Sequence, residues 1–364
     1  DVRVVAGLVA GGIAGLGSGV TVGKIFGNWA LSRQLAEADQ QLSELKGSLE
    51  DSVHLWLRPP RRSDDYVKVI RDSIPIITVV NLKGGVGKTT IAANLVAYFS
   101  EQRRRDGSPL KILVIDLDYQ GSLSVMLLSE AEIGDVETTS NLLVDPQHSI
   151  ATAKAKARRL RPRFDNVWLY AAHDDFLPDE NRLMMEWITQ RNPDHGDLRY
   201  ELHRKLQSPG FLDDYDLVII DGPPRMTTGF LAGLCASTHL LIPTIADRLS
   251  APAWIRFLVQ LQQLGPELFP ATTQLGLVPS RTYRPDGTLT EKEKRVIDLM
   301  LADLRTRHQI FDTNVFRDAA ISHTASFIEA AGSSLAYFHE TDPVPRKVIS
   351  QLGNEIKDRI RLKR

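Results

Sequence analysis

Short apolar runs separated by stretches of helical spacing fill the chain from Ile74 onward. Five of these runs are rich in β-branched residues and bounded by polar or turn residues: Ile76–Asn81, Lys111–Asp116, Asp216–Ile220, His239–Thr244 and Gln274–Val278. Strands that alternate with helical stretches are typical of βαβ units, and nearly continuous apolar strands are typical of a sheet buried on both faces. The pattern predicts an α/β fold: a mostly parallel, twisted sheet with helices on both faces.

The N-terminal segment from Val4 to Val22 contains no charge and no proline. Its length approaches the roughly 20 apolar residues that a helix needs to cross a bilayer. Glycine recurs there at every fourth position, a spacing that lets two helices pack closely in lipid: Gly7, Gly11, Gly15, Gly19 and Gly23. We therefore expect residues 1–30 to form a glycine-rich hydrophobic segment and a candidate transmembrane helix. A glycine-rich buried helix is the alternative. The chain opens on Asp1 and not on methionine, which leaves room for residues upstream.

Residues 31–52 carry small or apolar side chains at alternating steps of three and four. These are Leu31, Leu35, Ala38, Leu42, Leu45, Leu49 and Ser52. Such spacing predicts either a short coiled coil or an amphipathic helix that lies on the following domain. Pro59 and Pro60 end the helical pattern, because proline blocks helix continuation and restricts the residue before it. We assign this helix and a Pro/Arg linker to residues 31–73, and the main domain to residues 74–364.

Composition is that of an ordinary soluble globular protein, with 43% apolar and 24% charged residues. The single cysteine, Cys235, excludes an internal disulfide and a Cys-rich metal site within one subunit, which favours a reducing compartment. A net charge of −1 gives no global attraction to nucleic acid or anionic lipid, so such binding requires local patches. Two basic patches occur: Lys154, Lys156, Arg158, Arg159, Arg161 and Arg163, and the C-terminal Arg346, Lys347, Lys357, Arg359, Arg361, Lys363 and Arg364.

A glycine-rich loop follows the first predicted strand and precedes a helical run at Ile91–Phe99. The loop reads Lys83, Gly84, Gly85, Val86, Gly87, Lys88, Thr89, Thr90. Glycines let the backbone curl so that its N–H groups point at phosphate oxygens, and the following helix adds its positive end. We expect Lys88 to reach the β and γ phosphates of a nucleotide and the Thr89 hydroxyl to bind Mg²⁺. Leu82 stands where the strict phosphate-loop spacing has glycine.

Acidic side chains end two further predicted strands. Asp116 and Asp118 end one strand, and their spacing projects both carboxylates the same way if the backbone is extended. Asp221 ends the next strand and is followed by Gly-Pro-Pro. Each motif alone also fits a solvated strand end or a simple turn. The carboxyl ends of parallel strands meet at one sheet edge, where open α/β folds bind ligands, so we expect all three motifs to form one ATP site.

The run Lys83–Thr90 resembles the deviant Walker A motif of the ParA, MinD and nitrogenase iron protein family of P-loop NTPases, and the chain is most similar to ParA-type partitioning ATPases. Asp116–Gln120 resembles the second acidic motif of this family, and Asp221 begins a run similar to its Walker B motif. The resemblance extends over about residues 75–360. It implies a dimer that sandwiches two ATP molecules, with Lys83 reaching the phosphates of the partner. It also implies that Asp118 orients the attacking water and that Asp116 and Asp221 lie near Mg²⁺.

Three residues depart from the family pattern. Tyr119 replaces a proline of the second acidic motif, Arg225 stands where a small residue is usual, and Phe316 stands where a proline often precedes the basic residue. For Arg225, a surface salt bridge is a simpler interpretation than a catalytic role.

The resemblance implies a weak ATPase that an unidentified protein partner activates. The N-terminal segment favours a membrane-tethered switch on the cytoplasmic side of the membrane. The alternative is a cytoplasmic, nucleoid-associated ATPase that binds nonspecific DNA through the C-terminal basic residues, although the same helix has an apolar face that predicts docking. Membrane positioning of the MinD type would place the anchor at the other terminus.

A tyrosine kinase is disfavoured because no tyrosine follows Phe338, and a nitrogenase iron protein is disfavoured because Cys235 is the single cysteine. A metabolic ligase such as dethiobiotin synthetase would have a substrate pocket that the sequence does not reveal, and it would not explain the N-terminal segment.

Overall fold

The structure, a computed structural model, describes residues 55–128, 143, 157–160, 163–172, 176–189, 196–330, 335–360 and 362. The chain divides into two compact units, Asp1–Arg58 and Pro59–Arg364, and the second contains all features discussed below. Both N-terminal predictions, the candidate transmembrane helix and the helix of residues 31–52, lie outside the described residues. Within the described ranges, no helix is both long and apolar enough to cross a membrane.

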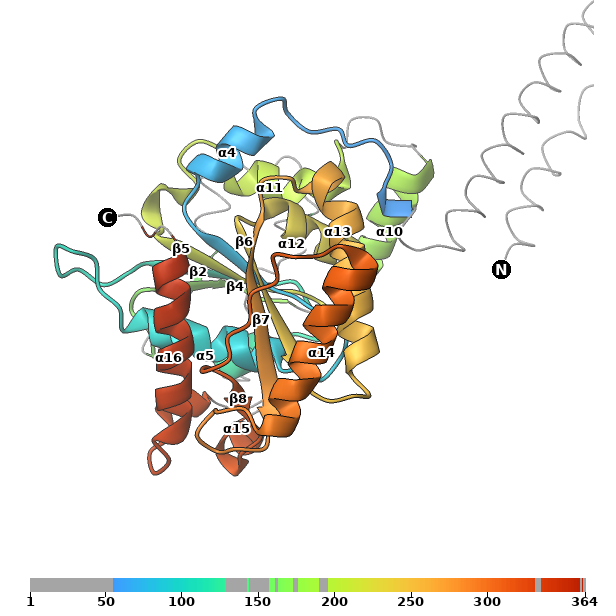
Figure 1. The fold of residues 1–364 in the computed structure, drawn as a ribbon. Helices are drawn as coiled ribbons and strands as arrows, with labels where there is room; N and C mark the ends of the chain where they lie inside the picture. Colours follow the sequence, from blue (N-terminus) through green and yellow to red (C-terminus); the bar gives the residue numbers. More distant parts are fainter. Residues whose placement is uncertain are drawn as a thin grey trace, which may run out of the picture. The chain divides into compact units, whose positions relative to one another are not determined.

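In the described part of the chain, eight strands form one sheet in the order β3-β4-β2-β5-β1-β6-β7-β8 (Figure 1). The strands are β1 (Ile76–Val79), β2 (Ile112–Asp116), β3 (Arg158–Arg159), β4 (Val167–Tyr170), β5 (Leu217–Asp221), β6 (His239–Ile245), β7 (Thr273–Thr282) and β8 (Ile321–Ser322). Only the β3–β4 pair is antiparallel among these strands. The predicted α/β fold with a mostly parallel sheet is therefore confirmed.

Each of the five predicted strands is present, with small changes at the ends. The strand predicted at Gln274–Val278 extends to Thr282 as β7, and this extension carries side chains toward the site described below. β4 was not predicted, because Val167 is its only β-branched residue. The two-residue strand β3, which pairs only with β4, was not predicted either.

Helices cover both faces of the sheet. One face packs against α5 (Lys88–Ser100), α6 (Ser122–Leu127), α15 (Ala325–Ala330) and α16 (Val344–Arg359). The other face packs against α11 (Glu201–Leu206) and α12 (Thr228–Ala236). Further helices are α4 (Tyr66–Asp72), α10 (Phe176–Thr189), α13 (Ala251–Leu268) and α14 (Glu291–His308). Strands β1, β2 and β5 are buried along their whole length, as expected for strands covered by helices on two faces.

The strand order determines where the candidate ligand site lies. From β1 the chain crosses to β2 on one side, and from β5 it crosses to β6 on the other side of β1. Such a reversal of direction creates a crevice outside the carboxyl ends of the strands, where ligands bind in open α/β sheets. The loops that follow β1, β2 and β5 therefore meet at one edge of the sheet.

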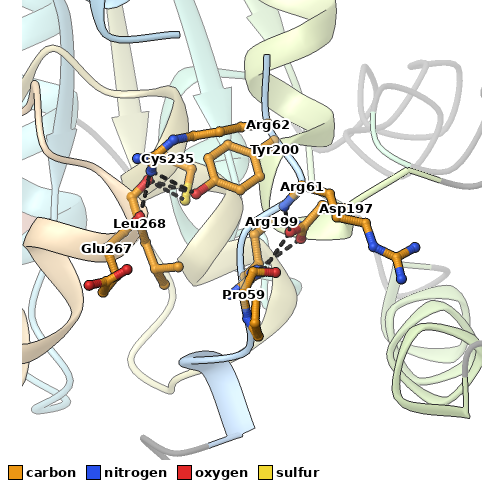
Figure 2. A network of polar contacts seen from close by, with 9 residues as sticks. All are labelled: Pro59, Arg61, Arg62, Asp197, Arg199, Tyr200, Cys235, Glu267 and Leu268. Atoms are coloured by element: carbon orange, nitrogen blue, oxygen red, sulfur yellow. Dashed lines mark hydrogen bonds and ion pairs between the residues drawn. The ribbon is translucent and has the colours of Figure 1, made fainter. Parts of the chain in front are cut away.

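Arg61 and Arg62, which follow Pro59 and Pro60 within the predicted linker, bond to residues 197–200 and to the end of α13 (Figure 2). Asp197 and Arg199 form an ion pair in which both side chains are only 1% exposed. Asp197 also accepts a hydrogen bond from the Arg61 backbone N–H at 3.0 Å. The Arg62 guanidinium donates to the Tyr200 hydroxyl at 3.3 Å, and that hydroxyl donates to the Leu268 carbonyl at the end of α13. The compact unit thus begins at Pro59, before the boundary placed at residue 74 from the sequence.

Candidate functional site

The phosphate loop lies between β1 and α5. Gly85 and Gly87 have φ angles of 71° and 84°, in the left-handed region that side chains with a Cβ avoid. Gly87 is also the residue from which α5 starts, so the positive end of that helix faces the loop. Lys88 is only 7% exposed, and its Nζ donates to the Lys83 carbonyl at 3.3 Å. The predicted loop therefore has the backbone form that phosphate binding requires.

Val86 differs from its neighbours in the loop. Its side chain is 1% exposed and belongs to the core, while its carbonyl accepts a hydrogen bond from Ser280 Oγ at 2.8 Å. Gly84, Gly85, Gly87, Lys88, Thr89 and Thr90 line the cavity beside the loop, whereas Val86 does not. Any contact of Val86 with a nucleotide would have to come from its backbone N–H.

Asp116 and Asp221 lie directly opposite each other at the ends of β2 and β5. The Thr89 hydroxyl donates to Asp221 Oδ2 at 2.7 Å, and Asp221 Oδ1 is buried with no hydrogen-bond partner among the described residues. An unpaired buried carboxylate oxygen is costly. Hard cations such as Mg²⁺ prefer carboxylate and hydroxyl oxygens. Thr89 and Asp221 thus fit the predicted magnesium site.

Asp116 differs from Asp221, because both of its carboxylate oxygens accept hydrogen bonds from the protein. Its Oδ2 accepts two hydrogen bonds from Ser124, from the backbone N–H at 2.9 Å and from Oγ at 2.8 Å. Its Oδ1 accepts from the Asp118 N–H at 3.1 Å. These bonds hold the loop after β2 and the start of α6 in place. A role for Asp116 at Mg²⁺ stays a prediction, because its oxygens already bind the protein.

Burial shifts the protonation of the charged groups around the loop. Desolvation raises the pKa of Asp116 to about 7, although the Ser124 and Asp118 hydrogen bonds oppose this rise. It also raises the pKa of Asp221 well above its usual range, helped by the nearby Asp116 charge. Desolvation lowers the pKa of Lys88, against the opposing effect of Asp221 and Asp118. Burial thus disfavours the charged forms of these two carboxylates and of Lys88. A cation would stabilise the ionised carboxylates and phosphates would stabilise the Lys88 ammonium, so the site favours a ligand that carries both.

Asp118 reaches the same cavity from the loop after β2. Its side chain is 8% exposed and lines the cavity, and its Oδ1 accepts a hydrogen bond from the Gln120 N–H at 3.2 Å. Gly121, which ends this loop, has a φ angle of 62° and lies against the Ala172 carbonyl. A side chain at this position would meet that carbonyl at 3.1 Å, so glycine is needed for the chain to turn into α6.

Lys83 lies at the rim of the site and bonds within its own chain. Its Nζ donates to Ser250 Oγ at 2.5 Å, and Ser250 Oγ donates to Asp247 Oδ2 at 2.8 Å. Its backbone N–H donates to Asn81 Oδ1 at 2.9 Å, which fixes the start of the loop. The structure therefore places Lys83 beside the first residues of α13, and its reach across a dimer stays a prediction.

A cavity of about 460 Å³ is lined by the phosphate loop and Asp118, whereas Lys83, Asp116 and Asp221 are not part of its lining. Its lining also includes residues that the sequence analysis did not assign to the site: Gln120, Ser122, Met126, Pro224, Ser280, Arg281, Ile321, Ser322, His323, Phe327 and Ile328. Many of them lie in or just after β7 and β8. Ser280 and Arg281 were not predicted, and the carboxyl end of the fifth predicted strand is the signal that could have found them. Within the described ranges, no group of three or more His, Cys, Asp or Glu residues has a metal-binding arrangement, but a site formed by Thr89 and Asp221 does not require one.

Three of the four described residues of the C-terminal basic patch make contacts within the protein. The apolar face of α16 is buried through Val348, Ile349, Leu352 and Ile356, which confirms the predicted docking. Arg346 contacts Glu101 at 2.8 Å. The Lys357 ammonium donates to Gln102 Oε1, and Arg359 lies over the Phe316 ring at 4.1 Å. These contacts reduce the number of cations that this helix offers to DNA phosphates. Arg361, Lys363 and Arg364 lie outside the described residues.

The chain is similar to several known proteins. The AAA_31 family profile, described as an AAA domain, matches residues 74–268, more than half of the chain. A Rhizobium rhizogenes protein named as a replication protein A is 28% identical over 199 residues, which are 54% of this chain and 46% of that protein. This chain thus spans about half the length of that relative. The chromosome-partitioning ATPase Soj of Treponema pallidum is 28% identical over 287 residues, 76% of this chain and 98% of its own.

Among solved structures, an ATP complex of McdA from Cyanothece has the same fold. Its TM-score is 0.57 at 22% sequence identity, and the match covers 79% of this chain and 97% of that protein. At this identity, the likeness shows the fold alone.

Proposed function

Since this chain belongs to the AAA_31 family of P-loop ATPases of the ParA and MinD type, we propose that it is an ATP-driven molecular switch. In the proposed cycle, residues 84–90, including the Lys88 side chain, bind the phosphates. Thr89 and Asp221 hold Mg²⁺, with Asp116 beside it. Bound Mg²⁺ would supply a positive charge that offsets the charge developing on the phosphates. The observation that carries the proposal is the buried Asp221 Oδ1, which has no hydrogen-bond partner among the described residues, on a carboxylate that accepts from Thr89, a residue that lines the cavity beside the phosphate loop.

Asp118 is the proposed group that orients the attacking water. It is the carboxylate of the cavity that lies outside the Asp116–Ser124 and Thr89–Asp221 hydrogen bonds. Positioning of the nucleophile and compensation of charge supply most of the rate acceleration in phosphoryl transfer. Lys83 is proposed to leave Ser250 and to reach the phosphates of a second copy, so that ATP stabilises a dimer that signals to a partner protein. Hydrolysis is proposed to be weak until that partner binds.

Binding and hydrolysis test this proposal directly. Lys88→Ala is expected to weaken binding of a fluorescent, non-hydrolysable ATP analogue by at least about tenfold, because one charge-assisted phosphate contact is lost. Asp118→Ala is expected to keep analogue binding and to lose hydrolysis. Unchanged hydrolysis in Asp118→Ala would refute the water assignment, and unchanged binding in Lys88→Ala would refute the site.

Dimerisation needs its own measurement. Light scattering after size-exclusion chromatography is expected to show an ATP-dependent dimer for Asp118→Ala, in which ATP persists. Adding Lys83→Ala to that variant is expected to leave a monomer. A dimer that persists without Lys83 would show that this lysine does not act across subunits.

The N-terminal segment suggests where the switch operates. We infer that Val4–Val22 anchors the ATPase at the cytoplasmic side of the membrane, because this uncharged, glycine-spaced run suits a spanning helix. Alkaline extraction of membranes from cells making the full chain is expected to leave it in the membrane fraction. Release into the soluble fraction would favour the alternative, a soluble ATPase on DNA. The likeness to Soj supports that alternative, whereas the internal contacts of Arg346, Lys357 and Arg359 weigh against it.

A further inference from the structure

Two side chains that depart from the family pattern, Tyr119 and Arg225, contact each other at the candidate site. The Arg225 guanidinium carbon lies 5.2 Å from the centre of the Tyr119 ring, within the range of a cation–π interaction. Tyr119 comes from the loop after β2 and Arg225 from the loop after β5. The surface salt bridge considered for Arg225 from the sequence is therefore not its described contact, which is with an aromatic ring.

This contact joins two loops that are otherwise hydrogen-bonded to each other only where they leave β2 and β5. Asp116 and Asp221 pair in register, and the Leu117 N–H donates to the Asp221 carbonyl at 3.0 Å. Beyond that point, no hydrogen bond is described between residues 118–121 and residues 222–227. Within the described structure, the stacked pair is thus the polar contact that holds the outer parts of these loops together.

The two loops carry groups of the candidate site. Asp118 immediately precedes Tyr119, and Pro224 immediately precedes Arg225; both Asp118 and Pro224 line the nucleotide cavity. Gly121 fixes the far end of the first loop against Ala172. Asp118 therefore lies between one fixed point at Asp116 and another at Gly121, and the Tyr119 ring is the side chain through which the second loop can restrain it.

We infer that Arg225, by stacking on Tyr119, is a positioning residue that holds Asp118 in the arrangement needed for hydrolysis. The inference rests on the proposed ATPase function. The half-buried Tyr119 ring packs against the core and also receives an exposed guanidinium, so loss of Arg225 releases this contact without opening the core. Arg225 acts in this scheme on the Asp118 loop and not on the phosphates.

The test compares four variants in the full chain with ATP and Mg²⁺, under single-turnover conditions. Arg225→Ala and Tyr119→Leu are each expected to lower the hydrolysis rate about tenfold, since small misplacements of a catalytic group cost about one to two orders of magnitude. The double variant is expected to be no slower than either single variant, because both remove the same contact. Tyr119→Phe keeps the ring face and is expected to retain activity within about twofold.

Affinity for a non-hydrolysable ATP analogue separates positioning from a structural defect. It is expected to stay within about twofold of the parent protein in all four variants, because the phosphate loop is untouched. Arg295→Ala is the matched control: Arg295 is an exposed arginine of α14 that lines a different pocket, and its loss is expected to leave both measurements unchanged.

Three results would overturn the inference. One is a normal rate in Arg225→Ala. Another is a slow Arg225→Ala beside a normal Tyr119→Leu, which would mean that Arg225 acts on the phosphates directly. The third is a double variant whose defect is the product of the two single defects. A parent protein that neither binds the analogue nor hydrolyses ATP would instead refute the proposed function, and this inference with it.

Discussion

At the scale of single residues, the candidate site is defined by which polar atoms already have partners. Asp116 uses both oxygens to hold its own loop, whereas Asp221 keeps Oδ1 unpartnered beside the Thr89 hydroxyl. The two carboxylates look equivalent in sequence, since each ends a buried strand. Their hydrogen bonds make Asp221 the better candidate for a metal ligand, and Asp116 the residue that shapes the loop before Asp118.

The Thr89 hydroxyl gives a specific prediction for magnesium. Thr89→Val keeps the shape of the side chain but removes the oxygen, so we expect hydrolysis to need about tenfold more Mg²⁺ for half-maximal rate. Thr89→Ser retains the hydroxyl and is the matched control, expected to behave like the parent protein. Equal Mg²⁺ requirements for the valine and serine variants would exclude Thr89 as a metal ligand.

His203 predicts a pH dependence of stability. It is 5% exposed and packs against Tyr66, and burial lowers its pKa from 6.5 to about 4. As the pH falls through 6.5, the unfolded chain binds a proton that the folded protein accepts only near pH 4. The free energy of unfolding therefore falls between these values, by at most about 3 kcal/mol from this group.

Removal of the imidazole tests this linkage. His203→Phe keeps a ring against Tyr66 and cannot titrate, so urea unfolding between pH 6.5 and 4 is expected to show a shallower loss of stability. His323→Gln removes an exposed histidine and is expected to leave the slope as in the parent protein. Identical slopes for His203→Phe and the parent would contradict the assignment.

At the scale of elements, the approach of α16 to α5 depends on one glycine. A Cβ on Gly353 would lie 2.3 Å from two ring carbons of Tyr98, and the Tyr98 hydroxyl bonds to Asn354. Glycine inside a helix normally costs stability relative to alanine. Here it lets the two helices pack closely enough for Val348, Ile349 and Leu352 to be buried.

Gly353→Ala is accordingly expected to destabilise the protein by about 1–3 kcal/mol, as overpacking does in a well-filled core. The measurement is the free energy of unfolding in urea. Tyr98→Ala removes the ring, so adding Gly353→Ala to it should carry no further penalty. Stabilisation by Gly353→Ala alone, as at an exposed helical glycine, would show that the helices can separate without cost.

At the scale of the whole molecule, the ATPase unit includes residues that the sequence assigned to a linker. Tyr66 and Ile70 of α4 are each 1% exposed, and the Tyr66 hydroxyl donates to the Cys235 carbonyl at 2.7 Å. Arg61 and Arg62 add hydrogen bonds to Asp197 and Tyr200 (Figure 2). Residues 61–70 therefore pack as part of the ATPase unit and not as a linker.

Two shortened chains distinguish the boundaries. A chain that begins at Pro59 is expected to melt in one cooperative transition. A chain that begins at Ile74 loses Tyr66 and Ile70, whose burial contributes about 1.5–3 kcal/mol each, and should be less stable by several kcal/mol. Equal stability of the two chains in urea would support the boundary at residue 74.

The central strands, the phosphate loop and the family could be predicted from the sequence alone, because each depends on local chemistry. Glycines at 85 and 87 are needed for left-handed backbone angles, and continuous apolar runs mark strands covered on both faces. The edge strand β3 and its neighbour β4 were not predicted, because Val167 is the only β-branched residue in them. Thr89 and Asp221 were predicted as magnesium ligands from motif spacing, and their close approach followed from parallel strands sharing an edge.

Contacts between distant segments were visible only in the tertiary structure. It showed that Asp116 bonds to Ser124, that Lys83 donates to Ser250, and that three basic residues of α16 make contacts within the protein. It also brought together Tyr119 and Arg225, which the sequence marked separately as departures from the family pattern. Local sequence fixes which backbone a segment can adopt, whereas the partners of a side chain are fixed only when strand order and helix packing bring remote residues together.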